Sequence, residues 1–427
     1  MNRACGNACL LMLVGQFALV AQTPNSADTA ETIRALLARI DRLEKRVADL
    51  EGTAGAARVE PPAVTASVAQ PSNLSPQPPP GSHDDHLAAT EAAQSAPQAP
   101  LLKLSGFSDV DFSATDQHGV KSGFNEGQFT LHTASALSKK VTVFGELTLT
   151  ARPDAGTGTP PATGFNAEVE RIVIRYDQSD YFKVSFGRFH TPINWWNTAF
   201  HHGAWLQTTA ARPEMVQFGG KFIPVHFVGG LIEGAVPAGG LHLNYNVGVG
   251  NGRGSILSRA GDAGDVNNNR AWLVNLFVKP DRLFGLQAGG SLYRDKIGVG
   301  TRNFDEWISS AHLVWAKENP EFIAEFANVN HTETGRPGSF NSQAFYVQLG
   351  YRLPEFGQRW KPYYRWEYIH MPSSDPVFTG IPDLAGSTLG MRYDITTFSA
   401  FKLEYRNLRR PGLPRINGVF AQTSFTF

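Results

Sequence analysis

The sequence has little cysteine, no long hydrophobic run and no excess of charge of either sign. Its two cysteines, Cys5 and Cys9, stand close to the N-terminus, so disulfides and cysteine metal ligands are not expected in the rest of the chain. No apolar run reaches the roughly 18 residues of a transmembrane helix, which excludes a helical membrane protein. The 38 basic residues equal the 38 acidic residues in number, and this balance gives no case for a nucleic-acid partner.

Residues 1–21 have the layout of a secretory signal peptide. Arg3 precedes an apolar run over residues 8–20, which ends in Leu-Val-Ala before Gln22. A lipid-anchored protein carries a cysteine after such a run, and neither cysteine follows it here. We therefore expect an exported protein without a lipid anchor, whose mature chain contains no thiol.

Residues 30–51 show the heptad pattern of an α-helical coiled coil. The a positions are Ile33, Ile40 and Val47, and the d positions are Leu36, Leu43 and Leu50. Arg39 and Arg46 occupy g positions, and Glu44 and Glu51 occupy the following e positions, which permits ion pairs between parallel chains.

Two oligomeric states and a monomeric alternative are compatible with this segment. Isoleucine or valine at a with leucine at d favours a dimer. The repeated Arg-apolar-x-x-apolar-Glu spacing, however, resembles that of short trimeric coiled coils, so we expect a trimer. A single amphipathic helix packed on its own chain is the alternative, because about three heptads are marginally stable alone.

Residues 52–100 have the composition of a disordered linker. They are rich in alanine, proline, serine and glutamine, and they include the run Pro78-Pro79-Pro80. Such a segment has too little apolar surface to offset its chain entropy, so we expect a partly polyproline tether. The sequence His83-Asp84-Asp85-His86 within it is interpreted as exposed polar residues rather than a metal site.

From residue 101 to residue 427 the apolar residues alternate with polar ones in blocks of about ten residues. Phe401, Leu403 and Tyr405, for example, alternate with Lys402 and Glu404. Connections such as 138–140 and 396–397 are short, whereas 252–268 and 372–384 are long and polar. The pattern predicts an all-β fold, a transmembrane antiparallel β-barrel of about sixteen strands with an aqueous lumen.

The last strand ends in Phe427, which resembles the sorting signal of bacterial outer-membrane proteins. With the signal peptide, the coiled coil and the alternating strands, the chain resembles trimeric substrate-selective porins. In particular it resembles the phosphate-selective porin O and P type and dicarboxylate-type porins with an N-terminal periplasmic coiled coil. This resemblance implies a homotrimer in contact with outer-membrane lipids, with its coiled coil in the periplasm. It also implies passive diffusion of small polar or anionic solutes.

Alternation also assigns charged side chains to the lumen. They include Asp109, Asp111, Glu146, Arg171, Arg175, Lys183, Glu321, Glu325, Arg352, Arg365, Glu367, Arg392, Lys402, Glu404 and Arg406. Acids facing cations across a lumen would orient dipolar or anionic solutes. Mutual neutralisation of these charges is the alternative.

Residues 190–217 interrupt the strand pattern at Pro192. A helix is expected over 194–204, and the insertion lies either in the lumen or over the rim. In the lumen it would form a constriction with wall cations. The predicted constriction residues are Trp196, Asn197, His201, His202 and Arg212 of the insertion, with Arg171, Arg175 and Lys183 of the wall. Packing of the aromatic residues that only anchors the loop is the alternative.

The sequence predicts neither a cofactor nor a metal site. His190, His201 and His202 are close in sequence, but no carboxylate stands at a familiar ligand spacing from them and HEXXH is absent. A barrel enzyme of the lipid-hydrolase type is one alternative function, but G-x-S-x-G is absent and no enzyme is predicted. A structural tether to the cell wall is the other.

Overall fold

The structure is a computed structural model that describes residues 100–427 apart from short gaps. The gaps are residues 152–163, 201, 218–221, 255–256, 258–260, 266, 380–382 and 413–414. The predicted signal peptide, the predicted coiled coil and the linker up to residue 99 lie outside the described residues. No helix in the described part is long and apolar enough to span a membrane.

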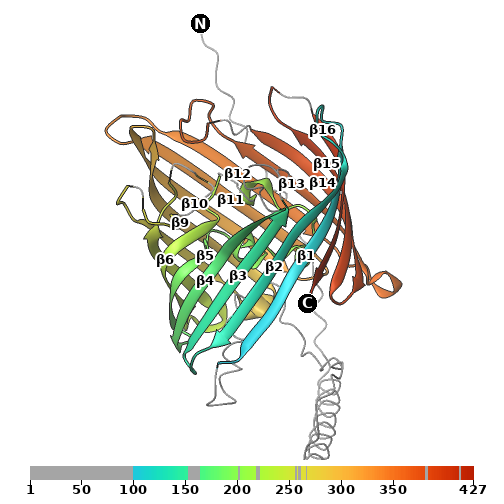
Figure 1. Ribbon diagram of the computed structural model, residues 1–427, viewed down its shortest axis with the longest axis horizontal. Helices are drawn as coiled ribbons and strands as arrows, with labels where there is room; N and C mark the ends of the chain where they lie inside the picture. Colours follow the sequence, from blue (N-terminus) through green and yellow to red (C-terminus); the bar gives the residue numbers. More distant parts are fainter. Residues whose placement is uncertain are drawn as a thin grey trace, which may run out of the picture. The chain divides into compact units, whose positions relative to one another are not determined.

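Sixteen antiparallel strands form a closed barrel in which each strand pairs with its neighbours in the chain and β1 pairs with β16 (Figure 1). The strands are β1 (Leu102–Thr115), β2 (Gly123–Ala136), β3 (Val141–Ala151), β4 (Phe165–Ser179), β5 (Phe182–His190), β6 (His226–Val236), β7 (Leu243–Asn251), β8 (Ala271–Val278), β9 (Leu286–Val299), β10 (Arg302–Ala316), β11 (Glu321–Glu333), β12 (Phe340–Gly350), β13 (Trp360–His370), β14 (Leu384–Thr396), β15 (Ser399–Arg409) and β16 (Ile416–Thr426). The predicted barrel of about sixteen strands is confirmed.

The helical elements of the described residues are all short. They are α3 (Trp196–Ala199) and the 3-10 helices η1 (Glu214–Val216), η2 (Gly239–Leu241), η3 (Asp281–Leu283) and η4 (Glu355–Gly357). The helix expected over 194–204 is therefore a single turn.

The barrel closes at the C-terminal residue. The backbone nitrogen of Gly106 on β1 donates to the carbonyl oxygen of Phe427 at 2.9 Å, and the nitrogen of Phe427 donates back to Gly106 at 3.1 Å. The Phe427 ring stacks on Phe129 of β2, with 5.6 Å between ring centroids. The terminal phenylalanine thus completes both the hydrogen-bonding and the packing of the seam.

The exposed face of the wall is apolar and the buried face is charged. On β15, the exposed side chains of Phe401, Leu403 and Tyr405 alternate with Lys402 and Glu404, which are 0% and 1% exposed. A soluble β-sheet protein has the reverse arrangement, whereas a barrel in lipid turns its apolar face outward.

The hairpin of β5 and β6 leaves the wall before it ends. β5 pairs with β4 only as far as Arg188, while its pairing with β6 continues to His190. Gly187 has a φ of +148°, and a Cβ there would lie 1.9 Å from the carbonyl oxygen of Ile172 on β4. Only glycine permits this close approach, from which the chain turns into the barrel. The described residues of 191–225, which we call the lumen loop, follow.

Candidate functional site

The lumen loop packs against the inner wall through an apolar core. Ile193 and Trp196 are fully buried, and Phe200 is 3% exposed. The Trp196 ring meets Phe200 at a centroid distance of 4.8 Å and Tyr346 of β12 at 6.0 Å, both edge to face. Apolar side chains of this kind provide most of the free energy that holds a segment in place. The loop is therefore an ordered part of the barrel interior.

Three carboxylates of the wall accept hydrogen bonds from backbone amides of the lumen loop. The Oε1 atom of Glu325 on β11 lies 2.7 Å from the nitrogens of both Trp195 and Trp196. Glu404 on β15 accepts from the nitrogen of Ala210 at 2.6 Å, and Glu367 on β13 accepts from the nitrogen of Glu214 at 2.7 Å. These bonds satisfy backbone donors that would otherwise be buried without partners.

Three cations of the wall donate to carbonyl oxygens of the same loop. Arg365 of β13 reaches Ala211 at 2.8 Å, and Arg392 of β14 reaches Trp205 at 2.7 Å and Gln207 at 2.8 Å. Lys402 of β15 reaches Thr209 at 3.1 Å. The charges of these side chains therefore serve mainly to fix the loop across the lumen, from β5 and β6 to the strands opposite.

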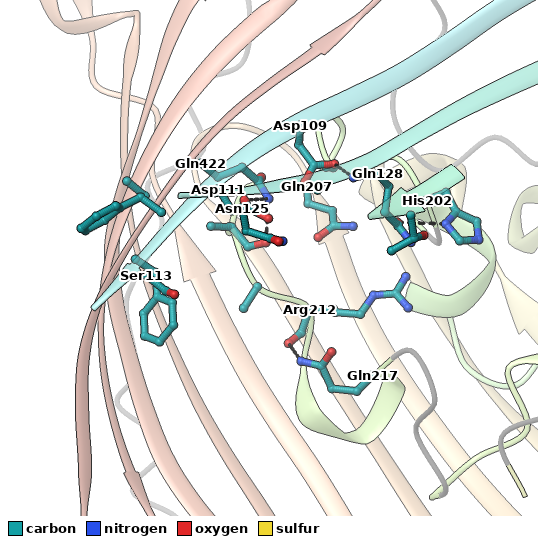
Figure 2. A pocket seen from close by; sticks show the side chains of 18 of the residues that line it. Asp109, Asp111, Ser113, Asn125, Gln128, His202, Gln207, Arg212, Gln217 and Gln422 are labelled. Carbon is teal, nitrogen blue, oxygen red and sulfur yellow. Dashed lines mark hydrogen bonds between the residues drawn. The ribbon is translucent and has the colours of Figure 1, made fainter. Parts of the chain in front are cut away.

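A cavity of about 460 Å³ remains between the lumen loop and the wall. It is lined by Asp109, Asp111, Phe112, Ser113, Asn125, Gly127, Gln128, Thr150, His202, Ala204, Gln207, Ala210, Ala211, Arg212, Gln217, Arg406, Phe420, Ala421 and Gln422. Figure 2 shows Asp109 and Asp111 on β1 and Arg212 and Gln217 on the loop around this space.

The cavity has acids on its β1 side and guanidinium groups on the lumen loop and β15. Asp111 accepts a hydrogen bond from Gln422 at 3.0 Å, and Arg406 forms an ion pair with Glu404 at 2.7 Å. Burial lowers the pKa of Arg212 from its usual 12.5 to about 9, so its guanidinium stays cationic at neutral pH. Fixed charges of opposite sign across a narrow space produce a transverse field that acts on dipolar solutes.

Of the predicted constriction residues on the loop, His202 and Arg212 line the cavity. Trp196 belongs to the apolar core, and Asn197 donates from Nδ2 to the carbonyl oxygens of Thr191 and Val225, at 2.9 Å each. Asn197 thus joins the two ends of the loop, Trp196 packs the loop against the wall, and neither residue lines the cavity. His201 lies outside the described residues.

The three predicted wall cations lie on β4 and β5, away from the cavity lining. Arg171 forms an ion pair with Glu146 on β3. Arg175 pairs with Asp177 at 2.7 Å, and Lys183 stands opposite Asp177 and Glu233 in the strand register. Each cation has an acid on a neighbouring strand or its own, an arrangement that side-chain alternation alone does not reveal.

The cavity also contains residues that the sequence did not single out. Gln128, Gln207, Gln217 and Gln422 line it, and neutral amides carry no charge pattern by which to select them. They come from β2, the loop and β16, so only the closed fold brings them together.

A sixteen-strand antiparallel barrel with an inward loop after β5 has the architecture of a porin-type barrel. No protein-family model matches the chain, and no curated protein matches it. Solved structures of the same fold include the anion-selective porin from Comamonas acidovorans, with a TM-score of 0.53 and 14% identity over 77% of this chain and 100% of that one.

Two further structures are similar at comparable levels. OmpF of Salmonella typhi, in complex with daunomycin, has a TM-score of 0.53 and 12% identity over 77% of this chain and 100% of that chain. The outer membrane channel DcaP of Acinetobacter baumannii has a TM-score of 0.52 and 10% identity over 78% and 99%. At these identities the similarity establishes the barrel fold.

Proposed function

We propose that this chain is a porin of a bacterial outer membrane, through which small polar and anionic solutes diffuse passively. The observation that carries this proposal is the cavity between the lumen loop and the wall, where Asp109 and Asp111 face a space also lined by Arg212 and Arg406. Acids and cations on different sides of a passage orient dipolar solutes. The fold shared with channels and porins supports the same function.

The proposal includes a homotrimer whose exposed apolar wall contacts membrane lipids and neighbouring barrels. Exposed side chains such as Ile172, Phe186 and Leu389 give the wall the apolar outer face that lipid requires. Trimerisation would be assisted by the heptad residues of 30–51, located in the periplasm. The finer assignment, a selective porin of the O and P or dicarboxylate type, rests on the sequence resemblance.

Planar-bilayer recording of the purified full-length protein tests the proposal. Steady ohmic current steps are expected. In a potassium chloride gradient, Asp111→Asn removes one negative charge from the cavity and should shift the reversal potential toward anion preference. Arg212→Gln removes one positive charge and should shift it toward cation preference. These two variants each neutralise one side chain of the cavity lining.

Asp305→Asn is the matched control. Asp305 forms an ion pair with Arg294 at 2.9 Å, and it alternates on β10 with the buried Phe304 and Glu306, so it stands on the outer face of the wall. The control should leave the reversal potential unchanged. A silent bilayer with correctly folded protein would refute the channel. Equal shifts from all three variants would refute the cavity as the site of selectivity.

A further inference from the structure

Three histidines from separate segments meet beside the cavity. They are His190 at the end of β5, His202 in the lumen loop and His226 at the start of β6. One imidazole nitrogen of each histidine lies within 4.8 Å of those of the other two. His190 and His202 are 6% and 4% exposed, and the side chain of His226 is 8% exposed. The three residues therefore form a compact cluster in the protein interior.

The inward turn of the β5–β6 hairpin creates this cluster. His190 and His226 are opposite each other in the strand register, on the part of the hairpin that has left β4. Their side chains meet carboxylates of the wall: His190 lies 3.4 Å from Glu146 on β3, and His226 lies 2.7 Å from Glu170 on β4. The cluster is thus enclosed between the hairpin, the loop and the wall.

Glu170 supplies a carboxylate whose nearest basic neighbours are imidazoles. Its Oε2 atom lies 2.7 Å from Nε2 of His226, and its Oε1 atom lies 3.3 Å from Nε2 of His202. Nη1 of Arg188 is farther away, at 3.9 Å, while Arg171 pairs with Glu146. Glu170 is 5% exposed, and a buried carboxylate needs a compensating positive charge.

The hydrogen-bond partners of His202 are compatible with a cation between its ring and Glu170. Its Nδ1 atom is 3.1 Å from Oε1 of Gln128, whose amide is oriented by donation from Nε2 to Thr150 at 3.4 Å. In the tautomer that donates from Nδ1 to Gln128, Nε2 carries the lone pair and can ligate a metal ion. In that tautomer the lone pair and the Oε1 atom of Glu170, 3.3 Å apart, are both acceptors, and a metal cation bound between them would satisfy both.

We propose that His190, His202, His226 and Glu170 bind one divalent transition-metal ion of the zinc class. Three imidazoles and one carboxylate form a donor set suited to tetrahedral Zn²⁺, and the imidazole ligands also suit Cu²⁺ and Ni²⁺. The structure already brings the imidazole nitrogens together, and a modest contraction would bring them to ligand distances from one ion. The bound ion would tie the lumen loop to the hairpin and the wall.

One rearrangement accompanies binding at His226. Nη2 of Arg188 lies 3.2 Å from Nδ1 of His226. A metal on Nε2 places the proton on Nδ1, so Arg188 would turn away from the ring. It already contacts Glu168 at 2.9 Å and Asp262 at 3.1 Å, and both acids remain available to it as partners.

Metal binding by the full-length, folded protein tests this proposal independently of conductance. The protein is purified without a histidine tag, treated with a chelator and titrated with Zn²⁺ by calorimetry. His83→Ala with His86→Ala removes the histidines of the linker from the titration. One Zn²⁺ per chain is expected. Co²⁺ in its place should show the intense visible absorption of tetrahedral coordination, and X-ray absorption should show imidazole ligands with Zn–N distances of about 2.0–2.1 Å.

His190→Asn and His226→Asn should each weaken Zn²⁺ binding by more than about a hundredfold, since even outer-shell changes cost ten- to a hundredfold. His312→Asn is the matched control, because His312 is a buried histidine of β10 that contacts Gln287 at 3.0 Å, outside the cluster. Folding of each variant is checked by its heat-modifiable mobility on a gel.

Unchanged affinity in folded His190→Asn and His226→Asn would overturn the proposal. If these variants do not fold, the Zn²⁺ titration and the Co²⁺ spectrum of the unaltered protein test the proposal. Absence of stoichiometric Zn²⁺ binding would overturn the proposal and leave a proton between His202 and Glu170, and an octahedral Co²⁺ spectrum would overturn the proposed tetrahedral ligand set.

Discussion

Removing the acceptor at Glu325 should release the first turn of the lumen loop. Glu325 accepts from the backbone nitrogens of Trp195 and Trp196, both at 2.7 Å, in a fully buried setting. A hydrogen bond to a charged group contributes about 1.5–3 kcal/mol. Glu325→Leu loses two such bonds, so the docked state should lose roughly 3–6 kcal/mol. Because about 1.4 kcal/mol corresponds to a tenfold change in an equilibrium constant, the population of the undocked loop should rise by a factor of about 10²–10⁴.

Hydrogen exchange of the peptide 191–200, followed by mass spectrometry in detergent, measures this population directly. Protection of these amides should fall by the same factor in Glu325→Leu. Glu325→Gln is the matched control, because it keeps an acceptor oxygen; neutral hydrogen bonds are about half as strong, so it should lose roughly half of the free energy. Equal protection in the unaltered protein and in Glu325→Leu would refute the docking role of this carboxylate.

Two further predictions concern the wall and the N-terminal segment. Gly187→Ala places a methyl group 1.9 Å from the carbonyl oxygen of Ile172 at a φ of +148°, so the barrel should lose about 1–3 kcal/mol and unfold at a lower temperature in a gel-shift assay. Gly412→Ala is the control, because Gly412 also has a positive φ, of +75°, but has open space around it. The loss of stability in this variant measures the cost of the positive φ without a steric clash. Ile40→Asp with Leu43→Asp should abolish self-association of a 30–52 peptide in sedimentation experiments, and a parent peptide that stays monomeric at millimolar concentration would contradict the coiled coil.

The barrel could be predicted from the sequence because its signal is local. Two-residue alternation sets the face of each side chain, and lipid demands an apolar exterior along every strand. The alternation of Phe401 and Leu403 with Lys402 is sufficient to place β15. The loss of alternation after His190 and its return near Val225 correspond to the end of β5 and the start of β6 at His226.

The lumen-loop contacts could not be predicted in this way, because they join residues far apart in sequence. Glu325 and Trp195 are 130 positions apart, and Glu404 and Ala210 are 194 apart. Alternation assigns Glu325 and Glu404 to the lumen side but cannot distinguish a carboxylate in water from one that accepts backbone amides. For the same reason the sequence alone does not relate His226 to His190, which are brought opposite each other by the pairing of β5 with β6.

Docking of the loop also determines which wall charges a solute can meet. Arg365 and Lys402 donate to loop carbonyls, and Glu404 accepts from loop amides, so the loop covers charged side chains that alternation assigns to open water. A variant that undocks the loop should therefore do two things at once: widen the lumen and expose these charges. Glu325→Leu should then change conductance and reversal potential together, whereas Asp111→Asn should change the reversal potential alone. Conductance unaffected by Glu325→Leu, in protein whose exchange shows the loop released, would mean that the passage is limited elsewhere in the barrel.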